Sequence, residues 1–347
     1  MTRYTIESTA TVHDALARLN ELSGGRMTLF VTDTEGRMLG TLTDGDIRRA
    51  LLGGVSLTDS VTRAMHTDFC SLRAGEVDVA RLAQFRRGGK MLIPVLDDAG
   101  KITDVIDLGL TRSRLPVSAI LMAGGLGERL RPMTLTTPKP LLEIEGKAII
   151  DYNVEALAAV GVTDITVCCR YLAEKIYRHF SQPVAGVDVK CVTETKPLGT
   201  IGAASLVDIP AEGDTLVMNS DLLTTISFEE MYLRHRDEEA AVTIAAIPYV
   251  VSVPYAILGT DGRRVTSIEE KPAYSYYANA GIYMISNRLL RSIPADERLD
   301  ATTFVEQALA AGERVVYYPI SGTWIDVGSP ADFRHAEELM RHYRSYK

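Results

Sequence analysis

A short segment of this 347-residue chain combines clustered glycines with cationic side chains. An apolar run ends at Ala123 and is followed by Gly124-Gly125-Leu126-Gly127, then by Arg129 and Lys139. Glycines lack a Cβ atom, so several backbone N–H groups can turn toward one anion. The guanidinium can bind phosphate oxygens in a fork, while the ammonium acts as a mobile point charge. The segment is therefore predicted to bind phosphate groups.

Two familiar phosphate-binding loops do not fit this segment. A Walker A loop requires the pattern GxxxxGK[ST], and no Gly-Lys-Ser/Thr triplet occurs here. A dinucleotide-binding fingerprint requires another glycine three residues after Gly127, where the chain has Leu130. The glycines thus indicate phosphate binding of a different kind.

Two aspartates follow apolar runs further along the chain. Asp221 comes shortly after residues 216–218, and Asp326 comes directly after residues 323–325. A single carboxylate at the end of a strand is more often a turn former than a ligand. Their significance therefore depends on the motifs around them.

The residues above lie in a region where strand-like and helical patterns alternate. Such alternation predicts an α/β fold with a mixed, mainly parallel sheet. In such a sheet, nucleotides commonly bind beyond the carboxyl ends of the strands. The strand-like runs are 117–122, 164–169, 214–218 and 242–247, and the helical stretches are 149–160, 171–180 and 201–206.

The first third of the chain contains a weak internal repeat at an offset of 64 residues. For example, Gly25-Arg26-Met27 recurs as Gly89-Lys90-Met91. Such self-similarity indicates two copies of one supersecondary unit. The pattern changes near residue 115, so we expect one domain at 1–115 and a second at 116–347.

Composition argues against several classes of protein. The net charge of −8 is unfavourable for gripping a nucleic-acid backbone. The four cysteines form no CxxC pair, which fits a reducing compartment and no structural zinc. Residues 240–260 carry no charge, but Pro248 and Pro254 favour two buried strands over a membrane span. No apolar leader opens the sequence, and a cytoplasmic location is expected.

Together with Thr-Pro-Lys-Pro-Leu-Leu at 137–142, the glycine-rich segment resembles the signature of sugar-1-phosphate nucleotidyltransferases, the NDP-sugar pyrophosphorylases. The resemblance covers nearly all of the second domain and implies a Rossmann-like, GT-A-like fold. It also implies the reaction NTP + sugar 1-phosphate → NDP-sugar + pyrophosphate. Four further motifs match in family order: 197–203 for the base, Asn219-Ser-Asp221 and Trp324-Ile-Asp326-Val-Gly328 for metal, and Glu270-Lys271-Pro272 with Asn279-Ala-Gly281 for the sugar phosphate.

The resemblance assigns a role to each matching residue. Asp221 and Asp326 are implied to hold Mg²⁺, the expected cofactor. Arg129 is implied to hold the β- and γ-phosphates, Lys139 to neutralise the α-phosphate, and Lys271 to hold the incoming sugar phosphate. The implied nucleotide-binding residues are Ala123, Gly124, Gly125, Leu126, Gly127, Glu128, Pro197, Leu198, Gly199 and Thr200, and the implied sugar-phosphate residues are Ser220, Glu270, Asn279, Gly281 and Trp324.

The first domain resembles a tandem pair of CBS domains, on its helix–strand–strand–helix order and on Gly40-Thr-Leu-Thr-Asp-Gly-Asp46. In such pairs a Thr and an Asp at the strand–helix junction hold the ribose of an adenosine nucleotide, and Thr43 and Asp46 match. The second copy has Asp107 and Leu110 at the aligned positions, so its ribose site is expected to be lost. The resemblance implies a regulatory pair that binds one nucleotide; a pair that only packs or dimerises is the alternative.

The choice of nucleotide and sugar stays open. Residues 198–203, LGTIGA, are closer to the LGTAGA form of guanylyl- and some uridylyltransferases than to the GLAQA form of thymidylyltransferases. With its CBS pair, the chain resembles the guanylyltransferases of legionaminic-acid pathways, which favours GTP and glucosamine 1-phosphate or a related hexose 1-phosphate. The alternatives are a mannose- or heptose-1-phosphate guanylyltransferase, a glucose-1-phosphate thymidylyl- or uridylyltransferase, and a catalytically inactive nucleotide-sensing CBS protein. A homo-oligomer without nucleic-acid or membrane partners is expected.

Overall fold

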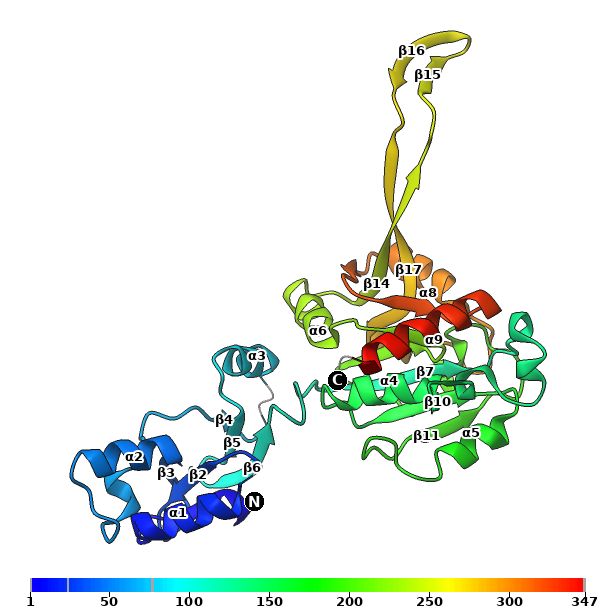
Figure 1. Ribbon diagram of the computed structural model, residues 1–347. Coiled ribbons are helices and arrows are strands. Elements are labelled where there is room, and N and C mark those ends of the chain that lie inside the picture. Colours follow the sequence, from blue (N-terminus) through cyan, green and yellow to red (C-terminus); the bar gives the residue numbers. More distant parts are fainter. Residues whose placement is uncertain (1, 24, 76–77, 346–347) are drawn as a thin grey trace. The chain divides into compact units, whose positions relative to one another are not determined.

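The computed structural model describes residues 2–23, 25–75 and 78–345. The chain folds as two units, Met1–Leu115 and Pro116–Lys347 (Figure 1), each with its own hydrophobic core. Among the described residues, none of the helices has the length and apolar character needed to cross a membrane.

The N-terminal unit contains two three-stranded sheets of the same topology. In each sheet the first strand pairs in parallel with the second, and the second pairs antiparallel with the third. One sheet contains β1 (Thr5–Glu7), β2 (Thr28–Thr32) and β3 (Met38–Thr43), with helices α1 (Val12–Glu21) and α2 (Asp44–Leu52), and the other contains β4 (Leu72–Arg73), β5 (Leu92–Leu96) and β6 (Ile102–Asp107), with helix α3 (Val79–Arg87).

The two halves of this unit differ after their third strand. Helix α2 follows β3 at once, whereas the described residues after β6 form a turn and then lead to the C-terminal unit. Asp107, at the end of β6, accepts a hydrogen bond from the backbone N–H of Gly109 (2.8 Å) and pairs with Arg26 of the first half (3.3 Å). The second half therefore has no helix N-terminus at the position where the first half has one.

The C-terminal unit is built on a seven-stranded sheet in the order β11-β10-β7-β12-β17-β14-β18. The first four strands are mutually parallel, β17 runs antiparallel to both of its neighbours, and β18 is parallel to β14. The prediction of a mixed, mainly parallel sheet is confirmed. The strands are β7 (Val117–Ala123), β10 (Ile165–Cys169), β11 (Lys190–Thr193), β12 (Asp214–Asn219), β14 (Val242–Ser252), β17 (Ala273–Ser286) and β18 (Val315–Pro319).

Helices and two small sheets complete this unit. Within the stretch 201–206, expected to be helical, Gly202–Leu206 form a 3-10 helix, and a Cβ atom on Gly202 would lie 2.7 Å from the carbonyl oxygen of Glu297. The helices are α4 (Ile149–Ala158), α5 (Ala173–His179), α6 (Phe228–Asp237), α7 (Asn287–Leu290), α8 (Ala301–Ala310) and α9 (Pro330–Ser345), and the small sheets pair β8 (Glu143–Ile144) with β9 (Lys147–Ala148) and β13 (Leu222–Thr224) with β19 (Trp324–Asp326).

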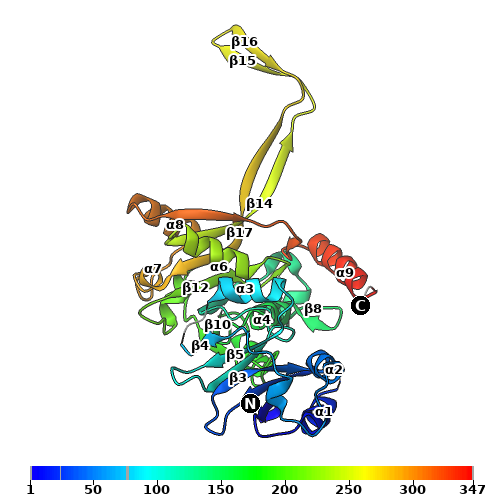
Figure 2. The same ribbon diagram turned by 90° about the vertical axis from the view of Figure 1, so that its left-hand side faces the viewer.

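Strands β14 and β17 continue beyond the sheet as a two-stranded ribbon, and β15 (Ile257–Asp261) and β16 (Arg264–Glu269) form its tip. We call residues 248–277 the arm; Figures 1 and 2 both show it projecting from the body of the C-terminal unit. The expectation of two buried strands in 240–260 is thus wrong for its second part. Residues 248–252 are exposed, because there β14 pairs only with β17 and no helix covers it.

Candidate active site

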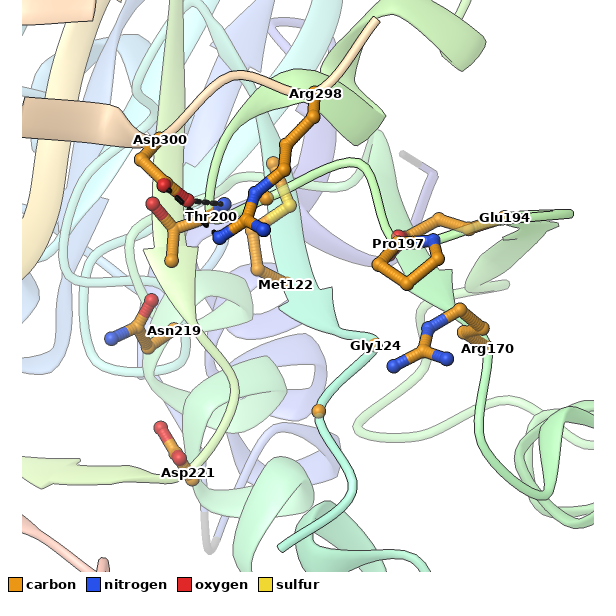
Figure 3. A pocket seen from close by; sticks show the side chains of 12 residues that line it. Met122, Gly124, Arg170, Glu194, Pro197, Thr200, Asn219, Asp221, Arg298 and Asp300 are labelled. Carbon is orange, nitrogen blue, oxygen red and sulfur yellow. Dashed lines mark hydrogen bonds and ion pairs between the residues drawn. The ribbon is translucent and has the colours of Figure 1, made fainter. Parts of the chain in front are cut away.

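The predicted phosphate-binding residues gather at the carboxyl edge of the parallel strands. Gly124 follows β7, Arg170 follows β10, and Asn219 ends β12, with Asp221 two residues later. Carboxyl ends of parallel strands lie at one edge of a sheet, where α/β proteins bind ligands. In Figure 3 these residues surround one cavity, and the side chains of Arg170 and Arg298 reach toward it from different walls.

Two cavities open at this edge, of about 380 Å³ and about 400 Å³, which we call the first and the second cavity. They share Thr200, Asn219 and Asp300 as lining residues, so they are neighbours. The first cavity is also lined by Met122, Gly124, Gly125, Arg170, Glu194, Pro197, Gly199, Asp221 and Arg298, and the second by Asn279, Ala280, Gly281, Tyr283, Ala301, Thr302, Trp324 and Asp326.

The two aspartates meet although 105 positions separate them in the sequence. Strands β13 and β19 pair antiparallel with Leu222 opposite Asp326, and the N–H of Val327 donates to the carbonyl of Asp221 (3.1 Å). The ammonium of Lys139 lies between the carboxylates: it bonds Asp221 and is 3.4 Å from Asp326 Oδ1. Because Asp221 lines one cavity and Asp326 the other, this ion-paired group connects them.

The electrostatics of this group favour a bound cation. Burial raises the pKa of Asp326, the Asp221 charge raises it further, and Lys139 and Arg129 only partly offset this. In the part of the chain that the structure describes, Asp221 Oδ1 is buried and has no hydrogen-bond partner. A buried carboxylate oxygen without a partner is costly, and Mg²⁺ prefers such hard oxygen ligands. Asp221 and Asp326 therefore fit the predicted divalent metal, the rest of whose ligands would be phosphate and water.

The glycine-rich loop is shaped by close packing. A Cβ atom on Gly124 would lie 2.3 Å from Glu194 Oε1, while Glu194 Oε2 accepts a hydrogen bond from the backbone N–H of Leu198 (3.1 Å). Gly127 has φ = +63°, a conformation that side chains disfavour, and its carbonyl accepts from the Thr134 hydroxyl (2.8 Å). Glu194 thus joins the loop after β7 to the segment predicted to recognise the base.

That base-recognition segment is anchored on the start of helix α8. Gly199 has φ = +82°, and a Cβ atom there would lie 2.4 Å from the carbonyl oxygen of Leu299. The backbone N–H of Thr200 donates to Asp300 Oδ1 (3.2 Å), and the Thr200 hydroxyl accepts from the N–H of Ala301 (2.7 Å). The segment is held by contacts with residues about 100 positions away in the sequence.

The second cavity is walled by polar groups of β12, β17 and β19. Gly281 has φ = +70°, and a Cβ atom there would lie 2.6 Å from the Asn219 side chain. Asn279 Oδ1 accepts a hydrogen bond from the Gly281 N–H (2.9 Å), and Trp324 Nε1 donates to the carbonyl of Ala280 (2.9 Å). Amide and indole groups of this kind suit hydroxyl-bearing ligands. No lysine or arginine is among the described residues that line this cavity.

Several predicted site residues lie outside both cavities. Ser220 is buried and its hydroxyl donates to the carbonyl of Met122 (2.7 Å), so it ties β12 to β7 and is not available to a sugar phosphate. Glu270 and Lys271 lie in the arm and are exposed. Arg129 lies beside Gly328, close enough to lower the pKa of Asp326. Lys139 lines neither cavity and lies against Asp221 and Asp326. The remaining predicted residues of the C-terminal unit outside the cavities are Ala123 and Leu198, both buried, and Leu126, Gly127 and Glu128 of the loop.

Four charged residues of the first cavity, Arg170, Glu194, Arg298 and Asp300, were not anticipated from the sequence. Arg170 follows the buried strand β10 directly, which is the same signal that drew attention to Asp221. Arg298 and Asp300 lie before α8, where Asp300 is the residue that precedes the first helical position. Glu194 likewise follows strand β11 directly. A charged residue next to a strand or at a helix start is a common pattern, so only the fold selects these four.

Comparisons with known proteins agree with this geometry. Residues 118–342 match the nucleotidyl transferase family, and residues 1–53 match the CBS domain. A mannose-1-phosphate guanyltransferase of Yarrowia lipolytica is 34% identical over 229 residues, which cover 62% of each chain. Mannose-1-phosphate guanylyltransferase 1 of Arabidopsis thaliana is 30% identical over 228 residues, 62% of this chain and 63% of that one. The chain thus spans about three fifths of the length of these curated relatives.

Solved structures share the fold of the C-terminal unit. HddC from Yersinia pseudotuberculosis superposes with a TM-score of 0.52 at 24% sequence identity, over 65% of this chain and 99% of that chain. At this level of identity the likeness establishes the fold alone.

Proposed function

Because the chain belongs to the nucleotidyl transferase family, we propose that its C-terminal unit transfers a nucleoside monophosphate from an NTP to a sugar 1-phosphate. The products are an NDP-sugar and pyrophosphate. The observation that carries the proposal is the group of Asp221, Asp326 and Lys139 at the meeting point of two cavities. One cavity has room for a nucleotide, and its neighbour has polar walls suited to a sugar.

The first cavity carries the groups that bind and orient the NTP. The backbone at Gly124 and Gly125 faces the cavity without side chains, so its N–H groups can approach phosphate oxygens. Arg170 and Arg298 supply positive charge from the cavity walls. The segment around Gly199, fixed through Glu194 and α8, is in position to contact the base.

The reaction is an in-line displacement at the α-phosphorus. A phosphate oxygen of the sugar 1-phosphate forms the new P–O bond, the bond to the β-phosphate oxygen breaks, and pyrophosphate leaves with that electron pair. No general base is needed, since a sugar phosphate is already ionised near neutral pH. Mg²⁺ held by Asp221 and Asp326 would supply charge neutralisation at the phosphates. Lys139 would shift from its carboxylate partners toward the α-phosphate and stabilise the charge that builds there.

For the nucleotide we propose GTP, and for the sugar we propose mannose 1-phosphate. The LGTIGA segment favours GTP, and the relatives named above are mannose-1-phosphate guanylyltransferases. The names of these relatives favour mannose 1-phosphate. The resemblance to the guanylyltransferases of legionaminic-acid pathways favours glucosamine 1-phosphate instead. The sugar is the finer choice, since it depends on the walls of the second cavity.

A panel of substrates tests the proposal. Pyrophosphate release is measured for GTP, UTP, dTTP, CTP and ATP, each with mannose, glucosamine or glucose 1-phosphate and Mg²⁺. The highest kcat/KM is expected for GTP with mannose 1-phosphate. Preference for glucosamine 1-phosphate would correct the sugar, and preference for dTTP would correct the base. No turnover with any pair would contradict the proposed reaction and favour a nucleotide-sensing protein.

We also propose that the N-terminal unit is a regulatory CBS pair that binds one adenosine nucleotide. The first half matches the CBS domain, and the second half repeats its strand pairing although the helix after β6 is missing. Titration calorimetry with AMP and ATP tests the stoichiometry. One site per chain with altered transferase kinetics is expected, and no binding of either nucleotide would contradict the proposal.

A further inference from the structure

The arm exposes an unusual amount of apolar surface. Ten of the twenty-two large apolar side chains that are exposed in the described residues belong to its 30 positions. Two-stranded ribbons without a covering layer are marginally stable in water, and large exposed apolar patches mark interaction sites. The arm therefore has the character of a surface that another molecule covers. The ten residues are Tyr249, Val250, Val251, Tyr255, Leu258, Val265, Ile268, Tyr274, Tyr276 and Tyr277.

The second cavity has no positively charged residue among the described residues that line it. Its charged lining residues are Asp300 and Asp326, both acidic, although the proposed ligand is a phosphate dianion. Lys139 is already engaged by two carboxylates, and Asp326 is proposed to hold Mg²⁺. No lysine or arginine among the described residues that line this cavity is therefore left to bind the phosphate dianion of the sugar directly.

The arm carries a cation, Lys271, in the segment that resembles a sugar-phosphate motif, but Lys271 lies far from the second cavity of its own chain. Lys271 precedes β17, and the chain then runs through the extended strand to Asn279 in the cavity wall. At about 3.3 Å per residue, the six steps from Ala273 to Asn279 alone span roughly 20 Å. That separation exceeds the reach of a lysine side chain. In this conformation Lys271 therefore cannot reach the second cavity of its own chain.

The arm is also tied into the sheet along its length. The ladder between β14 and β17 continues without a break from Ala246 and Asn279 to Ser252 and Ala273, and the N–H of Val253 donates to the carbonyl of Pro272 (3.0 Å). Folding Lys271 back onto its own cavity would break this ladder. Lys271 itself has φ = +44°, a strained conformation for a non-glycine residue, and such strain gathers at ligand-binding positions.

We propose that the arm docks on a second copy of this chain and delivers Lys271 to the second cavity of that copy. The inference rests on the proposed function, because it supplies the cation that a sugar phosphate requires there. The apolar side chains of the arm gain a cover, and the ammonium of Lys271 faces the acidic wall formed by Asp300 and Asp326. Exchange of arms is reciprocal in a two-fold dimer, so each catalytic site combines residues from two chains.

A mixed dimer distinguishes delivery between chains from delivery within one chain. One chain carries Lys271→Ala and one tag, its partner carries Asp221→Asn and another tag, and the doubly tagged dimer is purified after co-expression. In the proposed arrangement the intact arm of the Asp221→Asn chain serves the intact cavity of the Lys271→Ala chain. One of the two sites is then complete, and half of the wild-type kcat is expected.

A second mixed dimer is the matched control. It combines Asp221→Asn with Asp326→Asn, two changes in the same carboxylate pair, so neither site is complete whichever chain supplies the arm, and no activity is expected. Inactivity of the Lys271→Ala/Asp221→Asn dimer beside an active wild type would overturn the proposal. Full activity of the Lys271→Ala homodimer, or a wild-type chain that is monomeric in light scattering, would overturn it as well.

The association itself has a readout that does not require turnover. Ile268→Asp places a charge on the apolar surface of the arm, where the wild-type side chain is 69% exposed, so the chain still folds. Loss of the dimer in light scattering is expected. A dimer that persists in this variant would overturn docking through the arm. If the wild type is dimeric but turns over no substrate pair, the proposed function is contradicted. The oligomeric state of the Ile268→Asp variant then still tests docking through the arm.

Discussion

We call the two neighbouring cavities with Asp221, Asp326 and Lys139 between them the cleft. The cleft and the strand–helix junction of the N-terminal unit both contain an aspartate beside a cation, but the two aspartates differ in how fully they are hydrogen-bonded. At the junction, Asp46 Oδ2 accepts hydrogen bonds from the backbone N–H and the hydroxyl of Thr43 (2.9 and 2.6 Å), and Oδ1 pairs with Arg49 (2.6 Å). In the cleft, Asp221 Oδ1 is buried and has no hydrogen-bond partner among the described residues. The junction satisfies its polar groups internally, whereas the cleft keeps acceptor capacity for a ligand.

The two acids differ in pKa for the same reason. Burial acts to raise the pKa of Asp46, but the hydrogen bonds from Thr43 and Arg49 outweigh it and hold the pKa below its usual value. Burial and the neighbouring Asp221 charge instead raise the pKa of Asp326. A carboxylate that the fold leaves poorly stabilised, as Asp326 is, is a common feature of binding sites.

Asp221→Asn is the strongest test of this comparison. The substitution keeps the shape of the side chain but removes the charge and one metal-binding oxygen, so a fall in kcat of about 10³-fold or more is expected. Pyrophosphate release measures it. Asp164→Asn, which removes an exposed ion pair with Lys190 (2.8 Å), serves as a control and should stay near wild type. An active Asp221→Asn chain would show that the unpaired Asp221 Oδ1 is not needed as a metal ligand.

Lys139→Met should give the next largest effect. The variant keeps the length of the side chain but removes the cation between the two aspartates, and a loss of about 10²-fold in kcat is expected. The matched control is Lys147→Met, because Lys147 forms an exposed ion pair with Glu155 (2.8 Å) away from both cavities. Equal, small effects of both changes would contradict the role of Lys139 in the cleft.

Gly124→Ala tests whether the cleft depends on close backbone packing. The new Cβ atom would lie 2.3 Å from Glu194 Oε1, so overpacking should lower the free energy of unfolding by about 1–3 kcal/mol and raise KM for the NTP. Thermal unfolding and KM for GTP are the measurements. Gly125→Ala, whose Cβ has no neighbour within 4 Å, should leave the melting temperature unchanged. Unchanged stability in the Gly124 variant would mean that Glu194 moves freely.

Thr43→Ala should have the smallest effect, confined to the N-terminal unit. Thr43 caps helix α2 in a reciprocal pair with Asp46, and loss of such a cap costs about 1 kcal/mol. Thr43→Ser keeps the capping oxygen and is the control. Calorimetry with AMP on the same variants separates a structural cap from a ribose site. If Thr43→Ala abolished AMP binding and left the stability unchanged, Thr43 would be a ligand-binding residue and not a structural cap. The contrast between this junction and the cleft would then be wrong.

The pH dependence of the Asp46 contribution follows from its lowered pKa. A carboxylate whose pKa is lower in the folded state stabilises the fold fully above its ordinary pKa of 3.8. This stabilisation is lost as the pH falls through the folded-state pKa. The difference in unfolding free energy between wild type and Asp46→Asn should therefore be constant near neutral pH and shrink in acid. A difference that persists at the lowest pH would assign it to packing.

Motif order was enough to identify the nucleotidyl transferase family. Gly124, Thr200 and Asp221 were predicted from the type and spacing of their motifs, and all three line the first cavity. Ser220 shows the limit of that logic. It belongs to the same motif as Asp221, but both residues lie in the turn after β12, where Ser220 is buried and its hydroxyl donates to the carbonyl of Met122.

Long-range geometry explains what the sequence could not provide. Arg298 and Asp300 join the cleft only because the loop before α8 packs on Gly199 and Thr200. The position of Lys271 depends on how far the β14–β17 ladder extends, and short-range patterns do not specify that length. The apolar residues at 249–251 predict a strand equally well whether a helix or another chain covers it.

The pairing of β13 with β19 also sets the order in which the protein becomes competent during synthesis. The first aspartate of the pair is at position 221 and the second at 326, with the arm and α8 made between them. Contacts between such distant parts of a chain form slowly, since a long loop must close first. A ribosome-bound chain that still lacks β19 can assemble the glycine-rich loop but not the carboxylate pair, so the candidate metal site is completed only late in synthesis.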